Sequence, residues 1–490
     1  MKHRVDPEGT RLPIKLDTTS NGEFEPVALS TANSAANRLA HQSATVNAKR
    51  LGIGRRDFLL SACGAASTLL AFNAANAAAG KSGGFFQLAA EAALEPQLAE
   101  SKLGKAEFIF DVQGHFVDPT GAWVKTAPAD AFKWAPKAGC ALASEPGARA
   151  HLACLAPEEF IKDVFFDSDT DMMVLSFVPS RRDAEPLTIE AADAVRQIVE
   201  RMEGSHRLMI HGRVNPNQPG DVEAMDELKE RWNVCAWKTY TQWGPDGNGF
   251  FLSDDIGIRF IEKARTLGVK IICVHKGVPF GRRSYEHSQC SDIGVVAKRF
   301  PDMTFLVYHS GYVIGKPEGP FAGKGSGDGI DTLIQSLVEN GIKPNSNVYA
   351  ELGSTWRFLM REPDSAAHAL GKLLKHCGEN NVLWGTDSIW YGSPQDQIQA
   401  FRAFQISPSF REKYGYPEIT PALRAKVFGL NATKPYNISA EEVKKRTCGD
   451  RVARERLAYL EHPEPHYLTY GPRTRREFLN LLAWNGGSRA

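Results

Sequence analysis

The chain has 490 residues, of which 42% are hydrophobic and 23% charged, so it is long enough to bury one large core or two ordinary ones. Its 58 basic and 57 acidic residues leave a formal net charge of +1, which gives no electrostatic footprint for a phosphate backbone, and we predict no nucleic-acid partner. The eight cysteines contain no CxxC pair. Loss of Cys63 with an export signal would leave an odd seven, which argues against a complete disulfide framework.

The first 50 residues are polar and lack hydrophobic periodicity, so we predict that they are disordered. An Arg55-Arg56 pair follows, and then an apolar run from Leu59 to Ala79. This order resembles a twin-arginine export signal with cleavage near Ala77 or Ala79. The alternative is an ordinary amphipathic helix that carries two arginines.

The export interpretation makes residues 1–79 a disordered region plus signal peptide and residues 80–103 a linker. It predicts a periplasmic or extracellular protein and the twin-arginine translocation machinery as a partner. No other stretch reaches the roughly 20 apolar residues that a membrane span needs, so we expect no membrane span in the mature protein.

Eight short apolar runs, most of them followed by a segment of helical spacing, occupy residues 104–440. The runs are Glu107–Gln113, Met173–Pro179, Arg207–Gly212, Val234–Thr239, Val269–His275, Thr304–His309, Asn347–Leu352 and Val382–Asp387. Strands that alternate with helices and are rich in Val, Ile and Phe predict a parallel sheet covered by helices. Eight units favour the α/β class and a (β/α)8 TIM barrel over a doubly wound open sheet.

The first run and the two residues after it carry three polar side chains, Asp111, Gln113 and His115. Because successive side chains of a strand alternate between its two faces, we expect these three to share one face. His275, His309 and Asp387 lie at the ends of the fifth, sixth and eighth runs. The carboxyl ends of barrel strands form the rim on which TIM-barrel active sites are built, so the sequence predicts a site there.

Two segments fall outside the eight units. Residues 118–163, between the first two strands, are rich in Pro, Ala and Gly and too long for an ordinary loop, which predicts a lid or wall over the site. Residues 441–490 are charged and helical and then rich in Pro and Tyr. They suit an arm that wraps the barrel or a neighbouring subunit, so a homo-oligomer is among the expected assemblies.

Several motifs together resemble the amidohydrolase-related family, which includes aminocarboxymuconate semialdehyde decarboxylase, the resorcylate decarboxylases and several lactonases. These motifs are Asp111-Val-Gln-Gly-His115, Val274-His275, Tyr308-His309-Ser-Gly311, Val348-Tyr-Ala-Glu-Leu352, Trp384-Gly-Thr-Asp387 and Asn431-Ala432. The resemblance spans about residues 107–438. Its most specific parts are Gly-Thr-Asp on the eighth strand and His-Ser-Gly after the sixth.

The resemblance implies that His115, His275 and Asp387 hold one divalent metal, with zinc expected first and manganese or iron as alternatives. It also implies that His309 stands beside the metal as an acid, a base or an oxyanion partner, and that Asp387 orients water or carries its proton. Imidazole nitrogen and carboxylate oxygen independently suit these metals. Such an ion acidifies a bound water, which then serves as a nucleophile near neutral pH.

Gln113 departs from the family pattern, which has histidine or glutamate at this position. A glutamine offers only a neutral amide oxygen, so metal affinity should fall. Three interpretations stay open: Gln113 is an unusual fourth ligand, the metal is held by three ligands plus substrate, or the barrel has lost its metal.

Four further residues are candidates for substrate binding. Lys238 on the fourth strand is expected to point inward and to pair with a substrate carboxylate or with Glu351. Arg282 is placed to clamp an acidic substrate, and Trp390 to form an aromatic wall. The plainer alternative is a solvated side chain for Lys238 and Arg282 and simple loop packing for Trp390, while Glu351 at the end of the seventh strand is expected near the site.

The leading hypothesis is an exported metal-dependent hydrolase that acts on a C–O or C–N bond of a small organic acid, lactone or amide. The alternative is a nonoxidative decarboxylase of an aromatic or unsaturated acid, which would use the same ligands. A third hypothesis, from another class, is a metal-free binding protein on the same scaffold. Fold alone does not choose among them.

Overall fold

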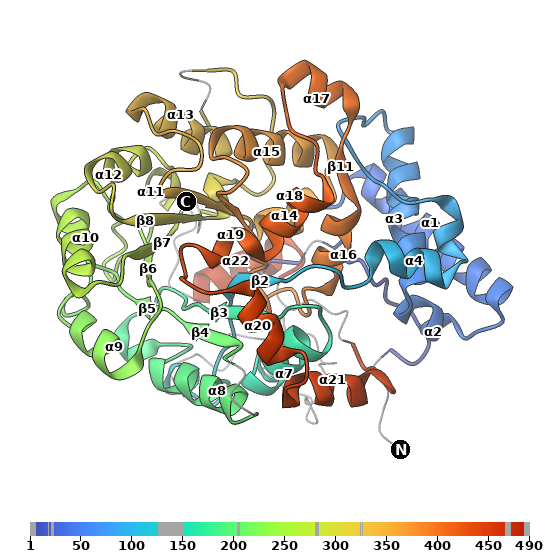
Figure 1. Ribbon diagram of the computed structural model, residues 1–490, viewed down its shortest axis with the longest axis horizontal. Helices are drawn as coiled ribbons and strands as arrows, with labels where there is room; N and C mark the ends of the chain where they lie inside the picture. The colour runs from blue at the N-terminus through green and yellow to red at the C-terminus, as the bar shows by residue number, and fades with distance from the viewer. Residues whose placement is uncertain are drawn as a thin grey trace.

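The protein is described from a computed structural model that covers residues 6–17, 19–20, 24–125, 150–202, 206–279, 284–323, 325, 327–465 and 472–484. Eight parallel strands form its centre and the helices surround them (Figure 1). The barrel strands are β2 (Phe110–Gly114), β3 (Met172–Leu175), β4 (Leu208–Ile210) continued by β5 (Gly212–Arg213), β6 (Trp237–Tyr240), β7 (Ile271–His275), β8 (Thr304–Tyr308), β9 (Val348–Glu351) and β10 (Val382–Leu383). Each of the eight predicted runs overlaps one of these strands.

The strands form a six-stranded sheet from β5 to β10 and a three-stranded sheet of β2, β3 and β4. Backbone hydrogen bonds join the two sheets at both seams. At one seam the backbone N–H of Cys235, just before β6, donates to the carbonyl of Ile210 at the end of β4 at 2.9 Å. Strands β4 and β5 form one bent strand, so this bond joins the two sheets. At the other, Val112 donates to Trp384 and Asp387 donates to Gln113, both at 3.0 Å. The ring is therefore closed, and the predicted (β/α)8 barrel is confirmed.

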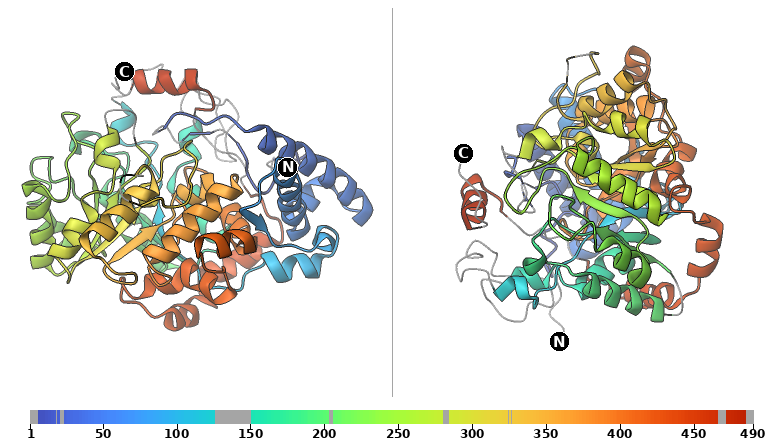
Figure 2. Two further views of the ribbon diagram at one scale, coloured as in Figure 1. Left: turned by 90° about the horizontal axis from the view of Figure 1, so that it is seen from above. Right: turned by 90° about the vertical axis from the view of Figure 1, so that its left-hand side faces the viewer.

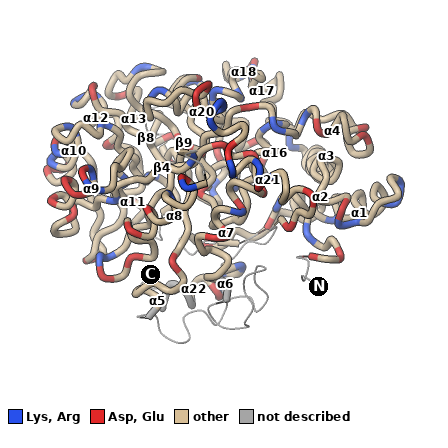
Figure 3. Tube along the Cα trace, turned by 60° about the horizontal axis from the view of Figure 1, so that its bottom comes forward, with Lys and Arg blue, Asp and Glu red and all other residues tan. Residues whose placement is uncertain are grey.

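The outer layer consists of helices that follow most of the strands and pack their apolar faces on the barrel (Figure 1). They are α8 (Ile189–Arg201), α9 (Met225–Trp232), α10 (Asp255–Leu267), α11 (Tyr285–Ser288), α12 (Ile293–Arg299), α13 (Ile330–Asn340), α14 (Thr355–Leu359), α15 (Pro363–His376) and α16 (Gln395–Ala403). Basic and acidic residues are interspersed over this layer (Figure 3). Within the part of the chain that the structure describes, no helix is both long and apolar enough to cross a membrane.

A second, smaller core is enclosed by the strands themselves. It includes Phe110, Val174, Cys273 and Leu306, and Tyr436 closes it from below. Ala432 of α19 (Asn431–Thr433) and Val443 of α20 (Ala440–Thr447) also belong to this core. The other described helices after the last strand are α17 (Pro408–Tyr414), α18 (Pro421–Ala425), a π-helix (Lys426–Leu430), α21 (Arg451–Leu460) and α22 (Arg475–Trp484).

The N-terminal region folds against one side of the barrel (Figures 1 and 2). It contains α1 (Thr31–Leu51), α2 (Arg55–Leu60), α3 (Ala62–Ala78), β1 (Gly84–Phe86), a 3-10 helix (Ala90–Ala93) and α4 (Pro96–Leu103). Strand β1 pairs antiparallel with β11 (Phe404–Ile406), which follows α16. The region is thus joined to the barrel by a sheet as well as by helix packing.

The prediction that residues 1–50 are disordered is wrong for residues 31–50, which belong to helix α1. Ser30 caps the start of α1, and Gly52, with a φ of 68°, caps its end. Along one face Ala36, Ala40, Ala44 and Ala48 are buried, in a packing contact with α3. These alanines recur every four residues, but their small size gives a weak hydrophobic signal, which is why the periodicity escaped the sequence analysis.

The insertion predicted at residues 118–163 is described at its two ends only. It contains α5 (Ala122–Lys125), α6 (Ala150–Ala153), α7 (Pro157–Ile161) and the start of a π-helix (Lys162–Phe166). The middle of the predicted lid, residues 126–149, lies outside the described residues.

Asp111 fastens the first barrel strand to the last. Its carboxylate accepts hydrogen bonds from the backbone N–H of Thr386 at 3.1 Å and from the Thr386 hydroxyl. Burial raises the pKa of Asp111 to about 7, although the bonds from Thr386 favour its ionised form. The predicted convergence of Asp111 with Gln113 and His115 is therefore wrong, because Asp111 is used to close the ring.

We expect Thr386→Val to weaken the closure, because a buried carboxyl loses a donor while the side-chain volume is kept. The free energy of unfolding should fall by about 1–3 kcal/mol, measured by urea denaturation. Thr266→Val, at an exposed hydroxyl in α10, is the matched control and should change it by about 0.5 kcal/mol or less. Equal stabilities of the two variants would contradict the role of the Asp111 clamp.

Candidate active site

A bulge at the end of β2 directs two side chains to the rim. Phe110 and Asp111 pair with Met172 and Met173, but the next paired residue of β2 is Gly114, opposite Leu175. Three residues of β2 thus advance against two of β3, which is the geometry of a β-bulge. Because the strict alternation ends there, Gln113 and His115 reach the carboxylate of Asp387 and Asp111 does not.

Asp387 is the centre of the candidate site. Its Oδ1 accepts from Nε2 of Gln113 at 2.8 Å and lies 2.9 Å from Nε2 of His115. Its Oδ2 accepts from the hydroxyl of Ser354. Burial opposes ionisation, but the hydrogen bond from His115 and the charges of His115 and His309 outweigh it and lower the pKa of Asp387 to about 2. Asp387 is therefore a buried, ionised carboxylate with three side-chain donors.

His309 and His275 face each other across the rim. Nδ1 of His309 lies 2.6 Å from the carbonyl of Gly353, so it carries the hydrogen, and the lone pair of the neutral ring is on Nε2. Nε2 of His275 lies 3.5 Å from the carbonyl of Val278, which places the lone pair of His275 on Nδ1. The two lone-pair atoms are 3.2 Å apart.

Both rings are held neutral. Burial, aided by the charge of Lys238, lowers the pKa of His309 to about 4 although Asp387 favours its protonated form. Burial and the charges of His309 and Lys238 lower the pKa of His275 well below its usual value. Two neutral imidazoles whose lone pairs face each other are unfavourable unless a proton or a cation lies between them.

The donor chemistry of the site therefore fits a divalent cation, because two imidazole lone pairs and an ionised carboxylate meet at one rim. The distances between these side chains, however, do not match those around a bound ion. Among the residues described, no group of three or more His, Cys, Asp or Glu side chains is arranged so that it could hold an ion. The direct contacts of His115 with Asp387 and of His275 with His309 take up that space, so an ion would have to replace them.

Gln113 takes part in this network as a hydrogen-bond donor. Its amide nitrogen donates to Asp387, while its Oε1 is buried and has no hydrogen-bond partner among the described residues. A Cβ on Gly353 would lie 2.2 Å from this oxygen and 2.6 Å from Oε1 of Glu351. Gln113 thus fills the space between Asp387 and the glycine, where the family pattern has a histidine or a carboxylate.

Glu351 ends β9 beneath His309. It accepts from the backbone N–H groups of His309 at 3.0 Å and Gly353 at 2.6 Å. Burial raises its pKa to about 8 against the effect of these two bonds. Gly385, in the Gly-Thr-Asp motif, leaves room for it, because a Cβ there would lie 1.6 Å from Oε1 of Glu351. The motif needs glycine at this position for steric reasons.

Lys238 points into the barrel below the rim. Its Nζ lies 3.7 Å from the centre of the Tyr308 ring and 4.8 Å from that of Tyr240. Its charge lowers the pKa values of His275, His309 and Glu351, so it acts on the site through space. His211 lies in the same inner layer, with Nδ1 3.2 Å from the hydroxyl of Ser176.

Trp390 lies against the site, with its ring stacked on that of His115 at 5.2 Å between centroids. Arg282, predicted to clamp an acidic substrate, falls outside the described residues. Sequence reasoning missed Ser354, the third donor to Asp387, whose hydroxyl lies 2.9 Å from that of Tyr391. Only the position of Ser354 just beyond a strand end was available as a signal for it.

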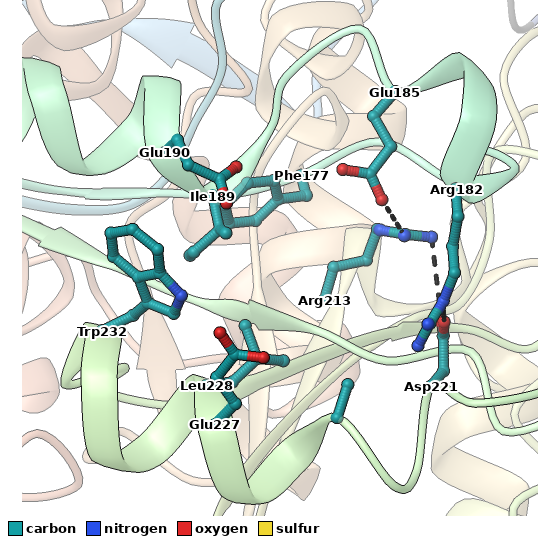
Figure 4. Close-up of a pocket in the computed structure, with 11 residues that line it drawn as sticks. Phe177, Arg182, Glu185, Ile189, Glu190, Arg213, Asp221, Glu227, Leu228 and Trp232 are labelled. Atoms are coloured by element: carbon teal, nitrogen blue, oxygen red, sulfur yellow. Dashed lines mark hydrogen bonds and ion pairs between the residues drawn. The ribbon is translucent and has the colours of Figure 1, made fainter.

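A pocket elsewhere on the barrel does not compete with this site. It lies by α8 and α9, has a volume of about 250 Å³, and is lined by Phe177, Trp232 and charged side chains (Figure 4). Those charges pair mainly with one another, as in the contacts of Arg182 and Arg213 with Asp221 at 2.8 and 3.8 Å. It contains none of the predicted site residues.

Comparison with known proteins identifies a family to which the chain is similar. The family profile described as amidohydrolase matches residues 110–438, which contain every predicted site residue. No curated protein sequence matches the chain.

Solved structures show only distant similarity. A 5-carboxyvanillate decarboxylase from Novosphingobium aromaticivorans, solved with manganese, has 13% identity and a TM-score of 0.43, over 69% of this chain and 99% of that one. A 2,6-dihydroxybenzoate decarboxylase from Rhizobium has 14% identity and a TM-score of 0.40, over 68% and 99%. A dihydroxybenzoic acid decarboxylase from Polaromonas, solved with manganese and 2-nitroresorcinol, has 12% identity and a TM-score of 0.41, over 68% and 97%.

Gly385→Ala should disturb the site from below, because the added methyl group overlaps Glu351. Overpacking of this kind costs about 1–3 kcal/mol, so the thermal midpoint should fall by several degrees. Gly319→Ala is the matched control, since a Cβ at Gly319 meets nothing within 4 Å. The same midpoint for both variants would show that Glu351 does not lie against Gly385.

Proposed function

The chain belongs to the amidohydrolase family, a family of metal-dependent enzymes, and on this premise we propose that it is a metal-dependent hydrolase of a small organic acid, lactone or amide. The observation that carries the proposal is the convergence of His115 and Asp387 with His275 and His309 at the carboxyl ends of the first, eighth, fifth and sixth strands. This is the end of a TIM barrel at which catalysis takes place.

We assign one divalent metal, zinc first and manganese or iron as alternatives, to His115, His275 and Asp387. The chemistry that such an ion supplies when bound is positive charge, which polarises a carbonyl oxygen and lowers the pKa of water. Gln113 is assigned a supporting role, since its amide hydrogen is directed at Asp387. An amide that donates to this carboxylate competes with the ion for the same oxygen, so we expect weaker metal binding than with histidine at this position.

His309 is proposed as the general base and acid. Its neutral ring has a lone pair on Nε2 at the rim, so it can accept a proton from water and return it to the leaving group. Asp387, ionised and held by three donors, orients the water. Lys238 and Glu351 lie on the inner side of the site, where the lysine charge favours a substrate carboxylate, and Trp390 provides a wall for an apolar ring.

A nonoxidative decarboxylase is the second candidate, and Glu351 is the observation that favours it. With a pKa raised to about 8, the buried carboxyl of Glu351 carries a proton at neutral pH. Decarboxylation needs a proton for the carbon that loses carbon dioxide, and a buried neutral acid beside the site can supply one. Hydrolysis of a C–O or C–N bond does not need a proton delivered to carbon.

Sequence features beyond the barrel support two further proposals. The Arg55-Arg56 pair before an apolar run supports export by the twin-arginine route to the periplasm or the exterior. Fractionation of cells that express the full chain tests this proposal, and purely cytoplasmic protein would contradict it. A homo-oligomer stays a prediction, which sedimentation of the purified protein tests.

The product decides between the two reactions. Incubation with small lactones, amides and hydroxybenzoic acids should give water uptake without loss of carbon if the protein is a hydrolase, whereas release of carbon dioxide would establish the decarboxylase. The assay should include added zinc, manganese or iron, with bound metal measured by mass spectrometry. No turnover and no metal under any of these conditions would favour the binding-protein hypothesis.

We expect His309→Ala to abolish turnover, a loss of at least about 100-fold, while bound metal is retained. Asp387→Ala should lose both turnover and metal. His376→Ala, in the last turn of α15 and against the ring of Phe321, is a control that should keep both. Activity in His309→Ala close to that of the unchanged protein would show that His309 is not the general base.

The pH profile gives a separate test. Because the pKa of His309 is lowered to about 4, the rate should fall as the pH drops through about 4, where the ring gains a proton and loses its free lone pair. If Glu351 is the proton donor of a decarboxylase, the rate should also fall as the pH rises through about 8, where this acid ionises. A hydrolase should lack the second limb.

A further inference from the structure

We infer that the N-terminal segment, residues 12–103 with the twin-arginine motif in it, stays with the barrel in the working protein, and that Asp17 in this segment is a positioning residue for Asp387. Retention of the segment stands on its own. The positioning role rests on the function proposed for Asp387.

The first observation is that both arginines of the motif are engaged inside the fold. Arg55 donates through Nε to the carbonyl of Gly9 at 2.8 Å and through Nη1 to that of His41 at 2.9 Å. Arg56 forms an ion pair with Glu464 at 3.0 Å and donates to the carbonyl of Pro463 at 3.1 Å. An export signal presents its arginine pair to a receptor, whereas here Arg55 is bound within the N-terminal region and Arg56 links that region to the segment after α21.

The second observation is the burial of the apolar run. Phe58, Leu59, Leu69 and Phe72 are almost completely buried, and the ring of Phe72 packs against that of Phe86 at 6.5 Å. Phe86 in turn contacts Phe404 of β11 at 6.0 Å. Removal of the run would expose this part of the barrel core to water.

Cleavage near Ala77 or Ala79 would also remove residues 12–17, which lie against the barrel beside the site. Ile14 is fully buried. Lys15 donates through Nζ to the carbonyl of Ser393 at 3.0 Å and pairs with Asp396 at 3.6 Å. Both partners follow the eighth strand, only a few residues after Asp387, so the segment supports the loop that leaves the site.

Asp17 connects this segment to Asp387 through three residues. Its Oδ1 accepts from Nη2 of Arg357 at 3.0 Å, and the guanidinium of Arg357 lies 5.5 Å from the ring centre of Tyr391. The hydroxyl of Tyr391 lies 2.9 Å from that of Ser354, and Ser354 donates to Oδ2 of Asp387. Asp17 thus stands at the outer end of a relay whose inner end holds the site carboxylate.

The charges show why Asp17 matters to this relay. The Arg357 side chain is only 1% exposed, and its Nε and Nη1 have no hydrogen-bond partner in the described part of the structure. The Asp17 side chain is 32% exposed, so it brings a partly hydrated carboxylate to a buried cation. Without Asp17 the buried charge of Arg357 would have no counter-ion among the described residues, which is strongly unfavourable and would shift the guanidinium away from Tyr391.

Retention is tested by the mass of the protein as cells make it. The full chain with a carboxy-terminal tag is expressed in a bacterium with a working twin-arginine translocase, and intact masses are measured for the cytoplasmic and periplasmic fractions. We expect folded protein to contain residues 12–103 in whichever fraction it occurs. Stable, folded protein that begins at residue 78 or 80 would overturn the inference, whereas the fraction itself bears only on export.

The positioning role is tested with Asp17→Asn, Asp17→Glu and the control Asp57→Asn, an exposed carboxylate of the same region. Asp17→Asn should lower the thermal midpoint by roughly 5 °C, and Asp17→Glu should restore most of it. With the substrate found in the product assay, Asp17→Asn should lower kcat about 10-fold and leave KM nearly unchanged, because it displaces Asp387 without touching the substrate. Asp57→Asn should change neither.

A double-mutant cycle keeps the test independent of any substrate. The midpoint shifts of Asp17→Asn and Tyr391→Phe should be non-additive in the double variant, because both act on one relay, whereas those of Asp57→Asn and Tyr391→Phe should add. Additive shifts for the Asp17 pair would overturn the positioning role even if no substrate is found. If the midpoint shifts of Asp17→Asn and Tyr391→Phe are non-additive but the protein shows no turnover, the result would count against the proposed function alone.

Discussion

The hydrogen bonds between the first and last barrel strands are the constraint on which the site depends. Asp111 and Thr386 fasten β2 to the segment after β10, and this seam places Gln113 and His115 beside Asp387. The bulge in β2 adds the one residue needed to direct both side chains to the rim. An open sheet of the same strands would leave these groups at opposite edges, so ring closure and site assembly are one event.

Closure also sets the electrostatics. The site is buried, yet it contains the ionised carboxylate of Asp387, two neutral imidazoles, the carboxyl of Glu351 with its raised pKa and the nearby charge of Lys238. Buried polar groups must stay at their hydrogen-bonding positions, because a misplaced charge inside the protein is costly. Gly353 and Gly385 leave the room that the side chains of Gln113 and Glu351 need there. The result is a site prepared for added positive charge, in which Gln113 competes for the carboxylate that such a charge would use.

The N-terminal region connects the outside of the barrel to the candidate site. Its helices pack on the outside, but residues 12–17 reach the loop after the eighth strand and the buried Arg357. A segment that carries the features of an export signal thereby becomes part of the wall behind Asp387. The two roles make opposite demands, because a signal must be accessible and this segment is buried.

The sequence by itself determined the barrel and the rim. The eight apolar runs are local patterns of six or seven residues, and His115, His275, His309 and Asp387 stand at or just beyond their ends. Periodicity alone therefore predicted both the strands and the edge on which these residues lie. The family followed from motifs that are equally local. Helix α1 was missed because a stripe of alanines has almost no hydrophobic signal until α3 covers it.

Only the tertiary structure decided what each polar residue does. Asp111 is diverted to Thr386, Gln113 donates to Asp387, and Ser354 and Asp17 join the network from 33 and 370 positions away along the chain. Such contacts depend on strand pairing and loop packing between distant segments, and no spacing in the sequence records them. A pattern fixes which residues stand at the end of a strand, whereas the closed ring fixes which of them meet.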